Sequence, residues 1–289
     1  YIEKDLQTLL GHKVRRHVLG TDPRHDPVVY DEQDQSFYVD VGTTKDGRYL
    51  YIHSQSTLSS EQRYADAADL GHEFRVISPR ERDHEYQADH FDGRWVIRTN
   101  WQAPNFRLME APVGASLDRS SWRELVAHGD EAFVHDFSVF RDFLAIEERS
   151  GGLRRLRIRP WNGDRDFYIA SDEPAYRAAL GDNEEIGAPF VRYTYTSLTT
   201  PTTTYDYDVR TGERRLLKQE PVLGGFDASR YATEYLWAPA RDGAEIPVAV
   251  VVVEEGHDPD TVIAALEARA AEHVAGYKRP TRYFVEDAL

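Results

Sequence analysis

Short apolar runs on either side of tight turns recur along most of the chain. The clearest copies are residues 37–41 with 49–52, 86–91 with 95–97, and 134–140 with 143–146. The turns between them carry Asp46-Gly47, Asp92-Gly93 and Arg141-Asp142. Asp-Gly between alternating apolar runs predicts a β-hairpin, because both turn positions tolerate positive φ.

A second set of hairpins fills the gaps: residues 14–19 with 28–30, 106–110 with 122–126, and 153–158 with 167–169. A last unit covers residues 190–196, 202–209 and 214–218, with a turn at Thr211-Gly212. Four strands every ~40–50 residues is the period of a β-propeller, whose blades must stack to bury both faces. The pattern predicts an all-β fold, an incomplete propeller with four to five four-stranded antiparallel blades. A large β-sandwich is the alternative.

The pattern changes near residue 248. An apolar run at 248–253 precedes an acidic segment with Pro259, an amphipathic helix over 261–274 and a short strand at 282–285. Apolar positions four residues apart and a Pro in the acidic first turn are typical of a helix and its start. We therefore expect a small C-terminal β-α-β appendage.

Composition narrows the function. The chain of 289 residues has 17 Tyr, one Met and no Cys, and its formal charge is −15. This charge disfavours nucleic acid as a partner and would attract cationic peptides, although solubility is the commoner reason for surface carboxylates. The lack of Cys suits the cytoplasm, and no apolar stretch is long enough for a membrane helix. The first residues resemble neither an initiator Met nor a signal peptide, so we expect a start inside a longer protein.

Candidate chemistry is sparse. No Gly-x-Ser-x-Gly pentapeptide and no phosphate loop occurs, so no catalytic residue, cofactor site or metal site is assigned. In the segment 82–90, strand alternation places His84, Tyr86 and His90 on one side and Glu85 on the other. This segment is interpreted as a metal cluster or as a blade strand with a polar face towards the central channel.

Glu147, Glu148 and Arg149 form the second candidate group. They are interpreted either as a binding site for a cationic substrate or as an ion pair at the end of a strand. Together with His84, Glu85, Tyr86 and His90, they are the candidate residues of a substrate channel.

Several motifs, in this order, resemble oligopeptidase B, of the prolyl oligopeptidase family of serine peptidases. They are Arg82-Asp83-His84-Glu85-Tyr86, Glu147-Glu148-Arg149, Tyr195-Thr196-Ser197-Leu198-Thr199-Thr200-Pro201, Asp208 with Thr211-Gly212-Glu213, and Trp237 with Arg241-Asp242-Gly243. The resemblance implies a seven-bladed propeller that caps an α/β-hydrolase domain and cleavage of short peptides after Lys or Arg. Residues 1–230 would be a partial propeller and 231–249 the first hairpin of the hydrolase domain.

The rest of that hydrolase domain, with its Ser, Asp and His, is not found in this sequence. The resemblance therefore implies a propeller that filters substrates and needs the α/β-hydrolase domain as its partner. A non-catalytic propeller that binds another protein is the alternative. Unpaired blade faces and strand edges also predict marginal folding and association.

Residues 250–289 resemble a different family, the C-terminal subdomain of acyl-CoA synthetases that form adenylates. The resemblance depends on Gly276-Tyr277-Lys278-Arg279-Pro280 and the acidic helix start. It implies a junction of two coding fragments near residue 250, and a remnant of an acyl-CoA ligase is a further alternative.

Overall fold

The computed structural model describes residues 1–69, 71, 73–239, 245–253, 264 and 268, and these residues form mostly antiparallel strands. The strands are β1 (Ile2–Lys4), β2 (Gly11–Arg15), β3 (Val28–Asp31), β4 (Tyr38–Thr43), β5 (Tyr49–Gln55), β6 (Ser60–Asp66), β7 (Arg75–Ser78), β8 (Tyr86–Phe91), β9 (Arg94–Thr99), β10 (Arg107–Pro112), β11 (Arg123–Val126), β12 (Ala132–Val139), β13 (Phe143–Ser150), β14 (Leu153–Pro160), β15 (Phe167–Tyr168), β16 (Tyr176–Leu180), β17 (Phe190–Ser197), β18 (Thr203–Asp208), β19 (Arg214–Gln219), β20 (Tyr231–Pro239) and β21 (Glu245–Val253). Short 3-10 helices are η1 (Pro23–His25), η2 (Val113–Ala115), η3 (Arg119–Ser121) and η4 (Ala228–Arg230).

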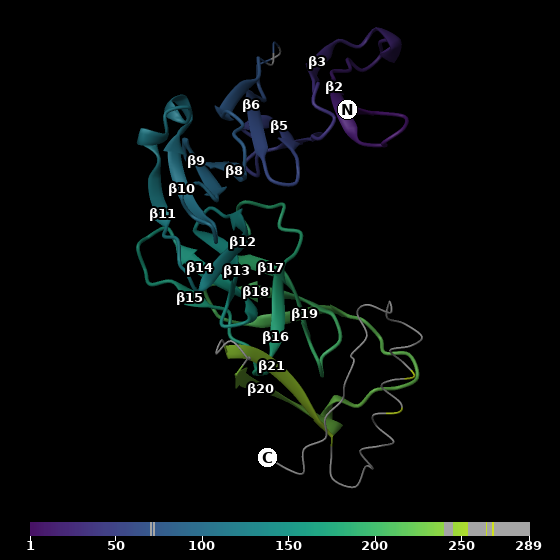
Figure 1. Ribbon diagram of the computed structural model, residues 1–289, viewed down its shortest axis with the longest axis vertical. Helices are drawn as coiled ribbons and strands as arrows, with labels where there is room; N and C mark the ends of the chain where they lie inside the picture. Colours follow the sequence, from purple (N-terminus) through teal and green to yellow (C-terminus); the bar gives the residue numbers. More distant parts are fainter. Residues whose placement is uncertain (70, 72, 240–244, 254–263, 265–267, 269–289) are drawn as a thin grey trace.

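Successive sheets follow one another along an arc (Figure 1). Blade 1 is the three-stranded sheet β1–β3, and blades 2 and 3 are the four-stranded sheets β4–β7 and β8–β11. Blades 4 (β12–β15) and 5 (β16–β19) are joined where β14 pairs with β16 in parallel, at Arg154 and Arg177. The prediction of an all-β, incomplete propeller with four to five antiparallel blades is confirmed.

Each blade buries its apolar side chains against the next one. Ile52 packs between blades 1 and 2, Trp95 between blades 2 and 3, Leu144 between blades 3 and 4, and Tyr193 between blades 4 and 5, each in its own cluster of buried residues. The core is therefore divided among the blade interfaces, as expected when a single sheet cannot cover both of its faces.

The Asp-Gly turn between β8 and β9 has the expected geometry. Asp92 has φ 49° and Gly93 has φ 76°, so both turn residues lie in the left-handed region. Asp and Gly tolerate that region, and the resulting turn matches the twist of a two-residue hairpin. The prediction of this hairpin is confirmed by the antiparallel register from Tyr86–Thr99 to Phe91–Arg94.

Strands β1, β6, β7 and β16 were not predicted, and β6 shows why. Its buried residues include Ser60 and Gln62, which are polar. The Gln62 side chain accepts a hydrogen bond from the Ala88 backbone N at 2.9 Å and donates one to the Ala88 carbonyl at 2.8 Å. Because these amides bond to the next blade, a polar strand is buried without an apolar pattern.

Beyond blade 5, β20 and β21 form a separate antiparallel hairpin in which Tyr231 pairs with Val253. The hairpin is attached to the blades by hydrogen bonds: Thr233 contacts Thr199 of the β17–β18 turn at 3.1 Å, and the Tyr235 hydroxyl donates to the Gly151 carbonyl. Of the expected C-terminal helix, Ala264 and Ala268 are helical, and its other residues and the final strand lie outside the described residues.

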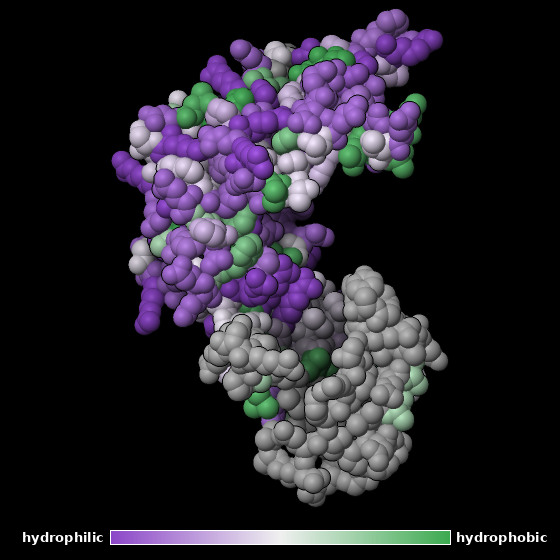
Figure 2. All heavy atoms as spheres, viewed as in Figure 1, coloured by the Kyte–Doolittle hydropathy of each residue, from purple (hydrophilic) through white to green (hydrophobic). Residues whose placement is uncertain are grey.

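The surface is mostly polar. Figure 2 shows hydrophilic residues over most of the visible face of the blades, with separate apolar patches. On the outer strand β19 every residue is exposed, including Leu216 with 57% of its surface accessible.

Candidate functional site

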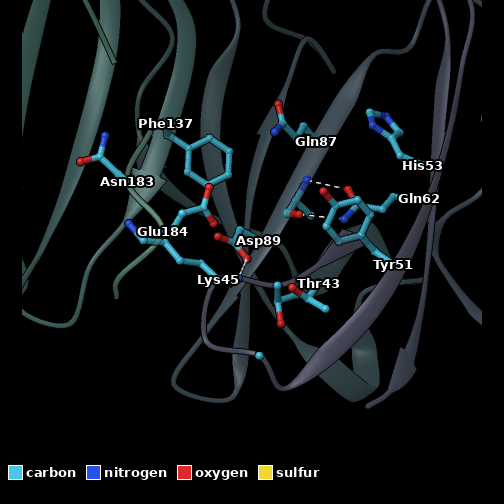
Figure 3. Close-up of a pocket in the computed structure, with 13 residues that line it drawn as sticks. Thr43, Lys45, Tyr51, His53, Gln62, Gln87, Asp89, Phe137, Asn183 and Glu184 are labelled. Atoms are coloured by element: carbon cyan, nitrogen blue, oxygen red, sulfur yellow. Dashed lines mark hydrogen bonds between the residues drawn. The ribbon is translucent and has the colours of Figure 1, made fainter. Parts of the chain in front are cut away.

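A cavity of about 360 Å³ lies where blades 2, 3 and 4 meet a loop of blade 5. The β4–β5 turn, β5, β8, β12 and the β16–β17 loop contribute its walls (Figure 3). Its charged and large side chains are those of Lys45, Tyr51, Asp89, Phe137 and Glu184. Residues from four blades thus converge on one polar space.

Lys45 connects blades 2, 3 and 4 at this cavity through hydrogen bonds. Its Nζ donates a hydrogen bond to Ser138 Oγ at 2.9 Å, and its backbone N donates to Asp89 Oδ1 at 3.0 Å. The β4–β5 turn of blade 2 is thereby fixed to β8 of blade 3 and to β12 of blade 4. Burial lowers the pKa of Lys45 to about 8, although Asp89 and Glu184 oppose this shift.

The cavity has more carboxylates than cations in its described lining. Asp89 and Glu184 face the single ammonium of Lys45. Burial raises the pKa of Asp89, and hydrogen bonds from the backbone N of Lys45 and of His90 oppose that shift. The excess negative charge favours a cationic group as an occupant.

Tyr86 and His90 lie on one side of β8, and His84 lies just before this strand; all three are buried, while Gln87 and Asp89 line the cavity. The Tyr86 hydroxyl donates to the Ser78 carbonyl at 2.6 Å and accepts from the Gln62 backbone N at 2.7 Å. The expected alternation of faces is therefore present.

The two histidines have protein partners. His84 Nε2 lies 2.9 Å from Thr99 Oγ1, and its Nδ1 accepts from Arg119 at 2.9 Å. Burial, with Arg119 beside it, lowers the pKa of His84 to about 4. His90 Nδ1 lies 2.6 Å from Asp46 Oδ2. Glu85 is half-buried, and its backbone N donates to Asn100. A contact of these residues with a substrate stays a prediction.

Glu147 and Glu148 are buried in β13 and pair with arginines of β14. Glu147 Oε1 lies 3.0 Å from Arg154 Nε, and Glu148 Oε2 lies 3.3 Å from Arg157 Nε. Burial raises the pKa of Glu147, while its other oxygen accepts from the Leu180 backbone N of blade 5. These carboxylates therefore bond within blade 4 and across to blade 5.

Arg149 differs from its two neighbours. Its side chain is exposed, its guanidinium lies 5.6 Å from the Phe133 ring centre, and it forms no ion pair with any described residue. Arg149 therefore does not take part in the ion pairs of Glu147 and Glu148, and all three lie at the end of β13 away from the turn that carries Arg141 and Asp142. Their role in a substrate channel stays a prediction.

Lys45 and Glu184 were not among the predicted site residues, and the fold brings them to the cavity from segments nearly 140 positions apart. Lys45 directly precedes the predicted Asp46-Gly47 turn, and Glu184 lies in a loop without a motif. In the described part of the chain, no three His, Asp or Glu side chains gather as metal ligands would. Nor do those residues include a helix long and apolar enough to cross a bilayer.

Comparison with known proteins agrees with this architecture. Residues 1–220 match the family model described as prolyl oligopeptidase, N-terminal beta-propeller domain. Dipeptidyl aminopeptidase BI of Pseudoxanthomonas mexicana is 48% identical over 90% of this chain and 36% of its own length. Protease 2 of Moraxella lacunata is 30% identical over 84% of this chain and 34% of its own length.

Among solved structures, oligopeptidase B from Trypanosoma brucei superposes with a TM-score of 0.79 and 29% identity, covering 90% of this chain and 38% of that one. Oligopeptidase B from Leishmania major gives 0.78 and 30%, covering 88% and 37%. The chain thus spans about a third of the length of these relatives. The family match ends at residue 220, and none of these relatives supports the acyl-CoA synthetase resemblance of residues 250–289. The chain belongs to the prolyl oligopeptidase family, and its residues 1–220 match the N-terminal β-propeller domain of that family.

Proposed function

We propose that this chain is the substrate-gating propeller of a cytoplasmic serine peptidase that cleaves short peptides after Lys or Arg. It holds the channel through which a peptide reaches a catalytic α/β-hydrolase domain, which supplies the nucleophile. Residues 231–249, which lie within the β20–β21 hairpin, belong to the start of that domain. Neither nucleic acid nor membrane is a partner in this proposal.

The acidic cavity among blades 2 to 5 is the observation that carries the proposal. Its volume of about 360 Å³ fits a few residues of an extended peptide and is too small for a folded protein. Asp89 and Glu184 attract a Lys or Arg side chain, in keeping with cleavage after basic residues.

A chimeric enzyme tests this function. Residues 1–220 of this chain replace the matching segment of the Pseudoxanthomonas mexicana relative, and cleavage of a short Arg-containing fluorogenic peptide is compared with that of a folded protein. We expect the short peptide to be cleaved and the folded protein to be spared. Cleavage of both substrates at similar rates contradicts the gating role.

Two matched variants of the chimera locate the acidic contact. Glu184→Gln removes a carboxylate of the cavity, and Glu131→Gln removes an exposed carboxylate from the loop before β12. Glu184→Gln should raise KM for the Arg-containing peptide several-fold, and Glu131→Gln should leave it unchanged. The purified chain alone should not turn over the peptide, and turnover that survives purification shows that the chain carries a nucleophile of its own.

A further inference from the structure

Three arginines lie side by side across three strands near the Gly151-Gly152 turn. Arg149 of β13 is directly opposite Arg154 of β14, and Arg154 is directly opposite Arg177 of β16. Like charges placed opposite one another destabilise a sheet. A row of three is therefore unexpected in a chain whose formal charge is −15.

A fourth arginine and a histidine complete the cluster. The strand β12 has a bulge at His135, between the paired positions Val134 and Asp136. Arg98 of blade 3 donates from Nε to the Val134 carbonyl at 2.9 Å, next to this bulge. A bulge redirects the side chain of the extra residue, so the fold brings His135 to the arginines.

His135 adds no compensating charge. Its Nδ1 accepts a hydrogen bond from Arg154 Nη2 at 2.9 Å, which fixes a neutral ring with the proton on Nε2. That Nε2 is buried and has no partner among the described residues. Burial and the surrounding guanidinium groups lower the pKa of His135 to about 4, so the ring is neutral at pH 7.

The carboxylates nearby do not neutralise the cluster. Glu147 pairs with Arg154 at 3.0 Å, and Asp136 and Glu85 act on Arg98. Four guanidinium groups thus face three carboxylates. Arg149 and Arg177 are exposed, and neither forms an ion pair with a residue that the structure describes.

The cluster has a fixed position relative to the acidic cavity. The strand β12 passes His135 at the cluster and Phe137 and Ser138 at the cavity. Three residues of extended strand span ~10 Å, the length of about three residues of a bound peptide. One inner strand therefore connects a cationic site to an anionic site at a separation that suits a short peptide.

We propose that the arginine cluster of Arg98, Arg149, Arg154 and Arg177 binds the carboxylate of a short peptide. The planar guanidinium group forms paired hydrogen bonds with a carboxylate, so Arg149 and Arg177 supply the open contacts while Arg154 stays held by Glu147 and His135. The proposal deepens the gating function proposed above, since the cluster orients the peptide with its cationic group towards Asp89 and Glu184.

Peptide binding to the purified full chain tests the cluster directly, without catalysis. Gly-Gly-Arg with a free C-terminal carboxylate is compared with its C-terminal amide by calorimetry at low salt. We expect the acid to bind at least tenfold more tightly than the amide, although the negative net charge of the chain favours the amide, which carries one more positive charge. Acetyl-Gly-Glu-Arg amide distinguishes a side-chain carboxylate from the C-terminal one, and its tight binding shows that either source is accepted.

Matched variants assign the effect to the cluster. Arg149→Gln combined with Arg177→Gln should abolish the preference for the acid, and Arg123→Gln, on the exposed outer strand β11, should keep it. Because the double variant relieves like-charge repulsion, its melting temperature should equal or exceed that of the wild type, which confirms that it folds. Equal binding of acid and amide, an unchanged preference in the double variant, or no binding of either peptide overturns the proposal. If the preference for the acid is absent but the chimera is active, the carboxylate site is refuted and the gating function is kept. If the chimera is inactive but the chain still prefers the acid, the gating function is refuted and the carboxylate site is kept.

Discussion

Lys45 Nζ lies 3.3 Å from the centre of the Phe140 ring, so a turn of blade 2 touches blade 4 across blade 3. The ammonium is stabilised there by the face of the aromatic ring and by Ser138, but it is also partly removed from water. This contact couples the assembly of three blades to the protonation of one side chain.

The pH dependence of stability follows from that coupling. The pKa of Lys45 is about 8 in the folded protein and 10.5 in the unfolded chain. Between pH 8 and 10.5 the unfolded chain holds more protons, so Lys45 contributes stability that increases with pH in this window. Urea unfolding of wild type and Lys45→Met at pH 7, 8.5 and 10 measures the effect. The free energy of unfolding of the wild type, relative to that of Lys45→Met, should increase with each step in pH. A difference that does not change with pH contradicts the coupling.

His84 should make the stability of the protein depend on pH at the acidic end of the range. Its pKa is about 4 in the folded protein against 6.5 in the unfolded chain, so the unfolded chain binds a proton first as the pH falls. The protein should lose about 1 kcal/mol between pH 6.5 and 5 through this group, after allowance for solvent screening. His84→Gln should flatten the unfolding free energy in that interval, whereas His25→Gln, on the exposed η1 turn, should not.

The hydroxyl of Tyr86 forms buried hydrogen bonds between blades 2 and 3. Tyr86→Phe leaves the buried backbone N of Gln62 without its acceptor, which should cost about 1–3 kcal/mol. Tyr231→Phe, at an exposed position, is the control and should stay within 0.5 kcal/mol of wild type, as is usual for surface changes. Denaturant titration at pH 7 measures both, and equal stability of the two variants refutes this role.

Glu173 attaches the β20–β21 hairpin to blade 5. It accepts hydrogen bonds from Tyr195 at 2.7 Å, Ser197 at 2.6 Å and Thr200 at 2.8 Å, and from Thr199, which contacts Thr233 of β20. Burial opposes its charge, but these hydroxyl donors lower the pKa of Glu173.

Glu173→Ala should therefore destabilise the protein by about 2 kcal/mol and increase hydrogen exchange in β20. Glu213→Ala, in the exposed turn after β18, provides the comparison. Unchanged exchange in β20 shows that other contacts hold the hairpin.

We expect copies of the chain to associate with one another through the exposed strand β19. Leu216 and Leu217 are exposed on this outer strand, where backbone groups are open to pairing. Sedimentation at increasing concentration should show association in the wild type and less in Leu216→Lys, because a charge blocks edge pairing. A wild type that stays monomeric with a sharp, reversible melt refutes this expectation.

Local pattern was sufficient for the hairpins whose strands have an apolar pattern. Asp92-Gly93 predicted a turn whose φ values the structure shows, because turn geometry depends on two adjacent residues. The strand β6 has no apolar pattern, because Gln62 is buried by hydrogen bonds to a strand more than 20 positions away. Such a partner cannot be seen from the segment itself.

The order of residues along the chain was sufficient to predict the hairpins with apolar strands, the family and the alternation of faces in β8. These properties depend on neighbouring residues and on motif order. The pairing of polar side chains depends on the folded chain, which brings Lys45 to Asp89 and Glu184, and Arg149 to Arg154 and Arg177. The physical reason is that stacking of the blades and the bulge at His135 set these distances, and both arise from contacts between distant segments.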